Sequence, residues 1–165
     1  MPSGFSVMIL IVMGVAGCGK STIGQLLADR VGWPFYDGDD FHPSANIEKM
    51  SKGIPLTDED RSGWLSALAE LIGERIQHNQ SAVIACSALK QKYRDRLAVD
   101  ARVRFVYLCG SYDLIEARLC ERPGHYMKPE LLASQFAALE EPTGVLTLDV
   151  SLAPEQLVAE IVRQL

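Results

Sequence analysis

The chain has 165 residues, of which 48% are hydrophobic and 22% are charged, and its formal net charge is −5 at pH 7. This length and composition fit one compact globular domain and exclude a disordered chain. The acidic balance gives no support for binding of nucleic acid or of an anionic membrane, so positive charge must be local, around an anionic ligand.

The cysteines and the first apolar run indicate a cytoplasmic protein. The cysteines form neither a C-x-x-C pair nor metal-ligand spacing, which favours buried thiols in a reducing compartment over a disulfide framework. The first apolar run, 7–13, is too short to span a bilayer, and no basic segment precedes it, so we expect a strand there. The four cysteines are Cys18, Cys86, Cys109 and Cys120.

Strands and helices are predicted to alternate along the whole chain. The expected elements, in chain order, are a strand at 7–13, a helix at 23–31, a strand at 34–37, a short helix at 47–50, a helix at 57–77, a strand at 82–86, a helix at 90–99, a strand at 103–108, helices at 114–120 and 131–139, a strand at 145–149 and a helix at 154–165. Thr57 and Asp60 are placed to form a capping box at the start of the long helix. This alternation predicts a single domain over 1–165, with a three-layer α/β/α fold around a five-stranded parallel sheet.

The loop between the first strand and the first helix has the phosphate-binding pattern G-x-x-x-x-G-K-[ST]. Its glycines would let successive N–H groups face phosphate oxygens, and the helix N-terminus would add a favourable dipole. We expect Lys20 to reach the β- and γ-phosphates and the Ser21 hydroxyl to bind Mg²⁺. The alternative is a glycine-rich turn that binds nothing, but a chance match is expected in about one per cent or less of chains of this size. The candidate nucleotide residues here are Gly14, Val15, Ala16, Gly17, Cys18, Gly19, Lys20, Ser21 and Thr22.

A phosphate-binding loop alone does not separate ATPases, GTPases and small-molecule kinases. The GTPase signature N-K-x-D is absent from the sequence, and no later strand has the h-h-h-h-D pattern typical of motor-type ATPases, since the third and fourth strands end at Cys86 and Leu108. The charged segments after the second and third strands favour a phosphoryl acceptor site within one small domain. A small-molecule kinase is therefore expected.

Two aspartates at the end of the second strand are candidates for the metal and the acceptor. Asp37 and Asp39 lie two residues apart, so an extended backbone would direct both to the same side. One could hold a Mg²⁺-bound water while the other orients the attacking hydroxyl. The alternative is a solvated, aspartate-rich turn.

Three cations are candidates for the acceptor side of the site. Arg61 lies in the first turn of a helix, where the dipole disfavours a cation, which suggests a ligand such as a substrate carboxylate. Lys90 and Arg94 follow the third strand and are expected to face the same cleft. For all three the alternative is a solvated surface.

The chain resembles the small bacterial gluconate kinases over essentially residues 7–165. The segments MGVAGCGKST at 13–22 and FYDGDDFHP at 35–43 are typical of that family. The further matching segments are 46–50, 53–61, 64–65, 85–90, 93–95 and 124–128. The resemblance implies transfer of the γ-phosphate of ATP to the 6-hydroxyl of gluconate with Mg²⁺, in an enzyme that is commonly a homodimer.

The resemblance also assigns roles to individual residues. Shikimate kinases carry a similar D-x-D, which implies that Asp37 lies near the metal, through water, and that Asp39 acts on the acceptor. Related kinases use arginines at the positions of Arg118 and Arg122 for adenine and phosphates, the latter from a lid expected at 122–130. Pro123 departs from the usual lid sequence. The catalytic candidates are Lys20, Asp39 and Arg94, and the substrate-binding candidates are Asp39, His42, Arg61, Lys90, Arg94 and His125, around acceptor-binding helices at 43–77. Trp64 is expected in the core.

Two other functions stay open at this level. A shikimate kinase or another small-acid kinase would have the same fold, although shikimate kinases lack the His42-Pro43 and Lys49-Met50 pairs. A nucleotide-binding switch would keep the phosphate loop without an acceptor site, and the group formed by Asp39, Arg61 and Arg94 argues against it.

Overall fold

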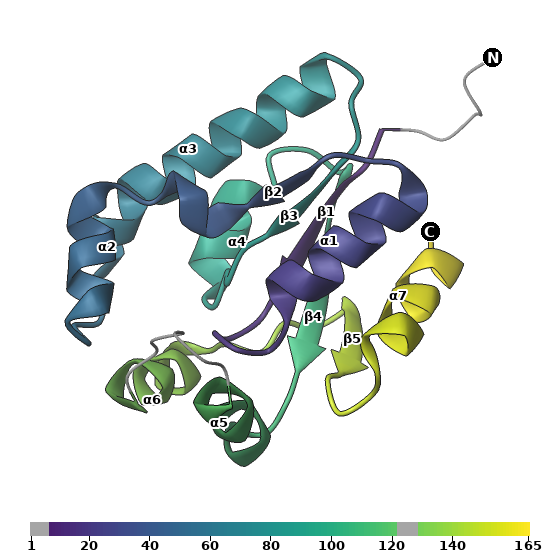
Figure 1. Ribbon diagram of the computed structural model, residues 1–165. Helices are drawn as coiled ribbons and strands as arrows, with labels where there is room; N and C mark the ends of the chain where they lie inside the picture. Colours follow the sequence, from purple (N-terminus) through teal and green to yellow (C-terminus); the bar gives the residue numbers. More distant parts are fainter. Residues whose placement is uncertain (1–6, 122–128) are drawn as a thin grey trace.

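The computed structural model describes residues 7–121 and 129–165, as five strands and eight helical segments (Figure 1). The strands are β1 (Ile9–Met13), β2 (Phe35–Asp37), β3 (Ala82–Ala85), β4 (Val103–Cys109) and β5 (Leu146–Asp149). The helices are α1 (Lys20–Val31), the 3₁₀ helix η1 (Gly38–Phe41), α2 (Ser44–Ser51), α3 (Asp58–Gln77), α4 (Gln91–Leu97), α5 (Tyr112–Cys120), α6 (Pro129–Ala138) and α7 (Pro154–Arg163).

The five strands form one parallel sheet in the order β2-β3-β1-β4-β5. The central strand β1 pairs with β3 on one side and with β4 on the other, so that Ile11 lies opposite both Ile84 and Phe105. Strands β2 and β3 lie on one side of β1, and the chain then passes over β1 to place β4 and β5 on the other side. The loop after β1 therefore lies at the point in the sheet where the direction in which strands are added reverses. Ligands bind at this position in open α/β sheets. The predicted fold class is confirmed.

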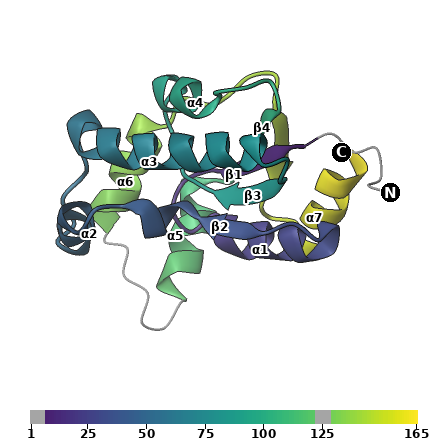
Figure 2. The same cartoon turned by 90° about the horizontal axis from the view of Figure 1, so that it is seen from above.

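Helices cover both faces of the sheet. Figure 2 shows α3 and α4 on one side of the sheet and α1 and α7 on the other. Alternate residues of β1 enter two separate hydrophobic clusters: Leu10 and Val12 pack with α1 and α7, whereas Ile9, Ile11 and Met13 pack with α3 and α4. A strand buried on both faces reads as a continuous apolar run, which explains the uninterrupted hydrophobic sequence here.

Local structure differs from the sequence prediction mainly around the second strand. The polar stretch after Asp37 begins as the 3₁₀ helix η1, because the Asp37 side chain accepts a hydrogen bond from the Asp39 backbone N–H at 3.0 Å and caps it. The next helix, α2, is longer than predicted and begins at Ser44. The predicted capping box at the start of α3 is confirmed, with Thr57 and Asp60 each bonding the backbone of the other.

No helix in the described parts of the chain combines the length and hydrophobicity that crossing a membrane requires.

Candidate active site

The phosphate-binding loop has a backbone that only glycine accommodates at its first and last turns. Gly14 has φ +149°, and a Cβ atom there would lie 2.8 Å from the carbonyl oxygen of Leu108 on β4. Gly19, with φ +100°, is the N-cap of α1 and supplies no side-chain cap. The first turn of α1 contains no acidic residue, whereas that of α3 contains three. The positive end of the α1 dipole is therefore left for an anionic ligand.

Lys20 and Ser21 lie where the loop enters the helix, and each has a partner. The Lys20 ammonium donates to the carbonyl oxygen of Val15 at 3.1 Å, so its charge is held over the loop. The Ser21 hydroxyl donates to Asp37 Oδ2 at 2.8 Å, while Oδ1 of the same carboxylate accepts from the Asp39 N–H. The Ser21 hydroxyl and the Asp37 carboxylate, from neighbouring elements, thus lie side by side, and oxygen ligands of this kind suit Mg²⁺.

One cavity of about 270 Å³ joins the phosphate-binding loop to the acceptor-side candidates. It brings together residues from the loop, from η1 and the segment that follows it, from α3 and from α6. Its polar lining residues are Lys20, Ser21, Thr22, Asp39, His42, Arg61, Trp64, Ser87, Ser134 and Gln135. The structure therefore places three of the predicted acceptor residues, Asp39, His42 and Arg61, in the same cavity as Lys20.

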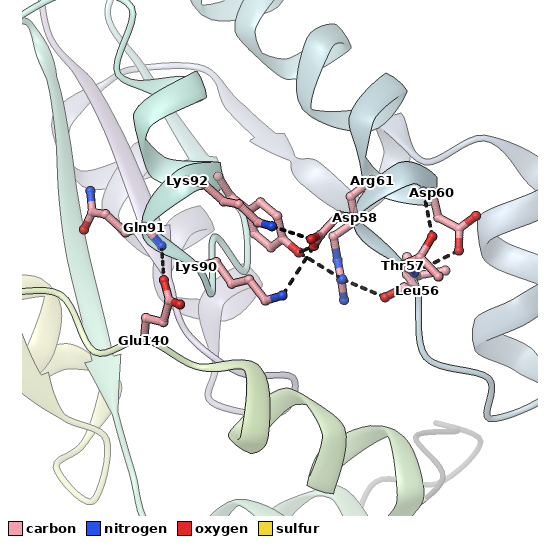
Figure 3. A network of polar contacts seen from close by, with 10 residues as sticks. Leu56, Thr57, Asp58, Asp60, Arg61, Lys90, Gln91, Lys92 and Glu140 are labelled. Atoms are coloured by element: carbon pink, nitrogen blue, oxygen red, sulfur yellow. Dashed lines mark hydrogen bonds and ion pairs between the residues drawn. The ribbon is translucent and has the colours of Figure 1, made fainter.

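Arg61 is held at the cavity wall by a chain of polar contacts (Figure 3). Its Nη1 donates to the carbonyl oxygen of Leu56 at 2.8 Å and to the Tyr93 hydroxyl at 3.2 Å, and its guanidinium lies 5.4 Å from the centre of the Tyr93 ring. Tyr93 in turn donates to the Asp58 carboxylate, which also pairs with Lys90, at 3.4 Å, and with Lys92. Nη1 is thereby fixed, and no partner for the other guanidinium nitrogens lies among the described residues.

The protonation states of this chain follow from its contacts. Hydrogen bonds from Lys92 and Tyr93 hold the pKa of the Asp58 carboxyl well below its usual range, so Asp58 is an acceptor at neutral pH. Burial and the neighbouring Asp58 raise the pKa of the Tyr93 hydroxyl, so it stays protonated and donates. Each hydrogen bond in this chain therefore has a defined donor: Arg61 donates to Tyr93, and Tyr93 donates to Asp58.

His42 also lines the cavity and is stacked on Trp64. The two ring centres are 4.3 Å apart and the planes differ by 13°. Trp64 is 1% exposed, as expected for a core residue, and its Nε1–H donates to the carbonyl oxygen of Gly38 at 2.7 Å. Burial lowers the pKa of the His42 imidazole below its ordinary value, which favours the neutral ring.

The structure does not bring Arg94 and Lys90 to the cavity, contrary to the expectation from their position after β3. Arg94 is 3% exposed, and its guanidinium donates to the carbonyl oxygens of Ala88 and Glu140, each at 2.7 Å, and to Gln91. Lys90 pairs with Asp58 instead. Arg94, which lies on α4, instead joins the segment before that helix to the stretch after α6.

A second hollow of about 200 Å³ lies beside the phosphate-binding loop and is lined by Arg118 of α5, Thr22 and Leu152 among others. Arg118 is thus next to the loop, where a nucleotide base or phosphate could reach it. Arg122, His125 and most of the predicted lid lie outside the described residues.

Three residues that the sequence did not single out contribute to the site. Gln135 of α6 accepts the Ala16 N–H of the phosphate-binding loop at 2.6 Å through its side chain. Tyr93 supports Arg61, and Asn46, buried on α2, contacts His42 at 3.2 Å. Gln135 and Tyr93 act between elements distant in sequence, whereas Asn46 is only four residues from His42, and only Tyr93 and Asn46 lie in segments that carry the family resemblance.

Comparison with known proteins identifies the family. The shikimate kinase family model matches residues 16–165. A gluconokinase from Gluconobacter oxydans is 42% identical over 164 residues, which cover 97% of this chain and 92% of that protein. A probable gluconokinase from Mus musculus is 46% identical over 153 residues, covering 82% of this chain and 83% of the relative. The chain belongs to the gluconokinase family.

Structural comparison agrees with this assignment. The crystal structure of a gluconokinase from Sinorhizobium meliloti has a TM-score of 0.85 and 43% sequence identity with this chain, and the match covers 96% of this chain and 91% of the other. The resemblance to gluconate kinases inferred from the sequence is confirmed. As a gluconokinase, the protein is a kinase of the P-loop type, and kinases are transferases.

Proposed function

We propose that the protein transfers the γ-phosphate of ATP to the 6-hydroxyl of D-gluconate, giving 6-phosphogluconate and ADP. The observation that carries this proposal is the single cavity in which the phosphate-binding loop meets Asp39, His42 and Arg61. A nucleotide-binding switch does not require residues that bind a phosphoryl acceptor. Membership of the gluconokinase family supplies the identity of the acceptor.

The nucleotide half of the site would bind Mg²⁺-ATP. Residues 14–22 and the N-terminus of α1 would hold the phosphates, and Lys20 would move from the Val15 carbonyl to the β- and γ-phosphates. Ser21 and, through water, Asp37 would hold Mg²⁺, whose chemistry is to neutralise charge on the β- and γ-phosphate oxygens. Arg118 would contact the nucleotide from the neighbouring hollow, and Arg122 stays assigned to the same task by resemblance.

The acceptor half would orient gluconate and its attacking hydroxyl. Asp39 lies on the cavity wall beyond Asp37, so it can accept the proton of the 6-hydroxyl while Lys20 stabilises the phosphoryl group in transit. The Arg61 nitrogens that have no partner in the described parts of the chain offer the planar fork of donors that a carboxylate accepts. His42 would bind a further oxygen of the acceptor, and His125 keeps that role by resemblance. Arg94 and Lys90 are assigned here to holding α4 and Tyr93 in place.

We further propose a homodimer in the cytoplasm. The dimer rests on the resemblance to gluconate kinases. The location rests on the reaction, which consumes the cellular ATP supply, and on the four free cysteines, which suit a reducing compartment.

An acceptor panel in a coupled ADP-release assay tests the proposal. Purified protein with Mg²⁺-ATP is given gluconate, other sugar acids, shikimate or no acceptor. We expect ADP release that depends on gluconate and stays at background with shikimate. Turnover with shikimate alone would assign the protein to the shikimate kinases, and acceptor-independent behaviour would favour a nucleotide-binding switch.

A further inference from the structure

Asn46 on α2 is one of two polar or charged residues that are fully buried in the described part of the chain, with 3% of its surface exposed. Its side-chain nitrogen Nδ2 donates to the main-chain carbonyl oxygen of Asp60 at 2.8 Å. The same nitrogen lies 3.2 Å from Nδ1 of His42. Asn46 thus stands between the start of α3 and a histidine on the cavity wall.

The Asp60 carbonyl fixes which way the Asn46 amide points. A carbonyl oxygen can only accept, so the atom facing it must be the amide nitrogen and not the amide oxygen. That nitrogen has a second hydrogen, which is directed at His42, and it has no acceptor capacity of its own. His42 Nδ1 must therefore be the unprotonated, accepting nitrogen. The neutral ring then carries its proton on Nε2.

The ring is also prevented from turning over. It is stacked on Trp64, and Trp64 is itself tied to the Gly38 carbonyl, so the plane of the imidazole is set from one side. Rotation of the ring by half a turn would replace Nδ1 with a carbon and leave the buried Asn46 hydrogen without an acceptor. The charged groups that act on the ring are Asp39 and Arg61, which share the cavity with it. No partner for Nε2 lies among the described residues.

We infer that Asn46 is a positioning residue that makes His42 a hydrogen-bond donor, through Nε2–H, to an oxygen of the phosphoryl acceptor. This rests on the proposed function for the nature of the acceptor, a polyhydroxylated acid whose hydroxyl and carboxylate oxygens can accept. Together with Arg61, the cavity then presents two donors to the acceptor and one carboxylate, Asp39, for the proton of the reacting hydroxyl. A histidine of the other tautomer would instead present a lone pair, and a carboxylate oxygen could not bind there.

The tautomer can be read directly, without substrate. Protein with ¹⁵N-labelled histidine is examined by two-bond ¹H–¹⁵N correlation NMR at pH 7.5, and the His42 signals are assigned by their loss in His42→Gln. We expect a pyridine-like shift for Nδ1 and a pyrrole-like shift for Nε2. In Asn46→Asp, whose carboxylate accepts, the proton should move to Nδ1, and in Asn46→Ala the two tautomers should mix. A wild-type ring protonated at Nδ1 would overturn the inference.

Kinetics test whether the donor matters for the acceptor. We expect Asn46→Asp and Asn46→Ala to raise the KM for gluconate about tenfold, the effect of losing one oriented hydrogen bond, while the KM for ATP stays near normal. In the His42→Gln background, whose amide can donate without a tautomer, the same Asn46 substitutions should have a much smaller effect. Equal effects in both backgrounds would reduce Asn46 to a packing role.

Lys49→Met is the matched control for a loosened α2. Lys49 lies one turn further along α2 and also contacts Asp60, through its side chain at 2.8 Å, but it is not bonded to His42. A folded Lys49→Met protein should keep the Nε2–H tautomer and the gluconate KM. The NMR measurement requires no acceptor, so it still tests the role of Asn46 if gluconate proves not to be the substrate. In that case the kinetic measurements use the acid that the acceptor panel identifies.

Discussion

At the scale of single residues, Asp37, which ends β2, and Asp39 in η1 show how contacts assign different roles to like side chains. Asp37 is occupied on both oxygens, by the Ser21 hydroxyl and by the Asp39 backbone N–H. Asp39 reaches the cavity from the first turn of η1. The sequence alone left the two roles open, because an extended backbone would have sent both side chains the same way.

Asp39→Asn should therefore impair the reaction more than nucleotide binding. Removal of the base that accepts the hydroxyl proton is expected to lower kcat by about a hundredfold or more, with little change in ATP affinity. Steady-state kinetics and a nucleotide-binding titration measure the two effects separately. If the affinity for ATP fell sharply while kcat at saturating ATP stayed normal, the roles of Asp37 and Asp39 would have to be exchanged.

Substitution of arginine by lysine should give opposite results at Arg61 and at Arg94. Arg61→Lys keeps the charge but loses the fork, so the KM for gluconate should rise or kcat fall, with an unchanged unfolding temperature. Arg94→Lys loses buried bonds to two carbonyl oxygens, so the unfolding temperature should drop while the KM for gluconate of the folded protein stays close to that of the wild type. Kinetics and thermal denaturation of both variants give the comparison. A larger kinetic effect at Arg94 would return it to the acceptor site.

At the scale of elements, α2 and α3 are joined by one ion pair that also belongs to a helix cap. Lys49 contacts both oxygens of the Asp60 carboxylate, at 3.0 and 2.8 Å, and the same carboxylate accepts from the Thr57 N–H in the capping box. These contacts lower the pKa of Asp60 from 3.8 to about 2. The ion pair thus fastens α2 to the first turn of α3, separately from the bond of Asn46 to the Asp60 main-chain carbonyl.

The Lys49–Asp60 contact should give a pH-dependent contribution to stability. Because the folded pKa is the lower one, the contribution is complete above the unfolded pKa near 3.8 and is lost as the pH falls toward about 2. Lys49→Met should thus unfold at a lower denaturant concentration than the wild type at pH 7. The difference should shrink between pH 4 and pH 2. Urea titrations across this range measure it, and a difference independent of pH would mean that the contact has no electrostatic role.

At the scale of the whole molecule, the fold and the phosphate-binding loop could be predicted because both are encoded locally. The apolar run of β1, the glycines of the loop and the periodicity of α1 are contiguous, and the alternation of elements then fixes a parallel sheet. The acceptor wall could be predicted only in part. Arg61 and His42 do line the cavity, but Arg94 does not, because its guanidinium is buried against two main-chain carbonyl oxygens that the sequence does not reveal.

The support of the site could not be predicted for the same reason. Asn46 on α2 contacts His42, Tyr93 on α4 contacts Arg61 on α3, and Gln135 on α6 contacts the phosphate-binding loop, and nothing in the local sequence pattern of an amide or a phenol indicates such a partner. The acidic chain nonetheless gathers Lys20 and Arg61 in one cavity and Arg118 in the hollow next to it. This local concentration of cations is what a triphosphate and a sugar acid require together.

The most direct test of phosphoryl transfer to the 6-hydroxyl of gluconate is proton-coupled ³¹P NMR of the reaction with Mg²⁺-ATP. A phosphate on the terminal carbon couples to two protons, so the γ-phosphate signal of ATP should be replaced by a phosphomonoester signal split as a triplet. The signal should fail to appear with the Asp39→Asn protein over the same time. A doublet, which marks a phosphate on a secondary carbon, or release of inorganic phosphate alone would contradict the proposed reaction.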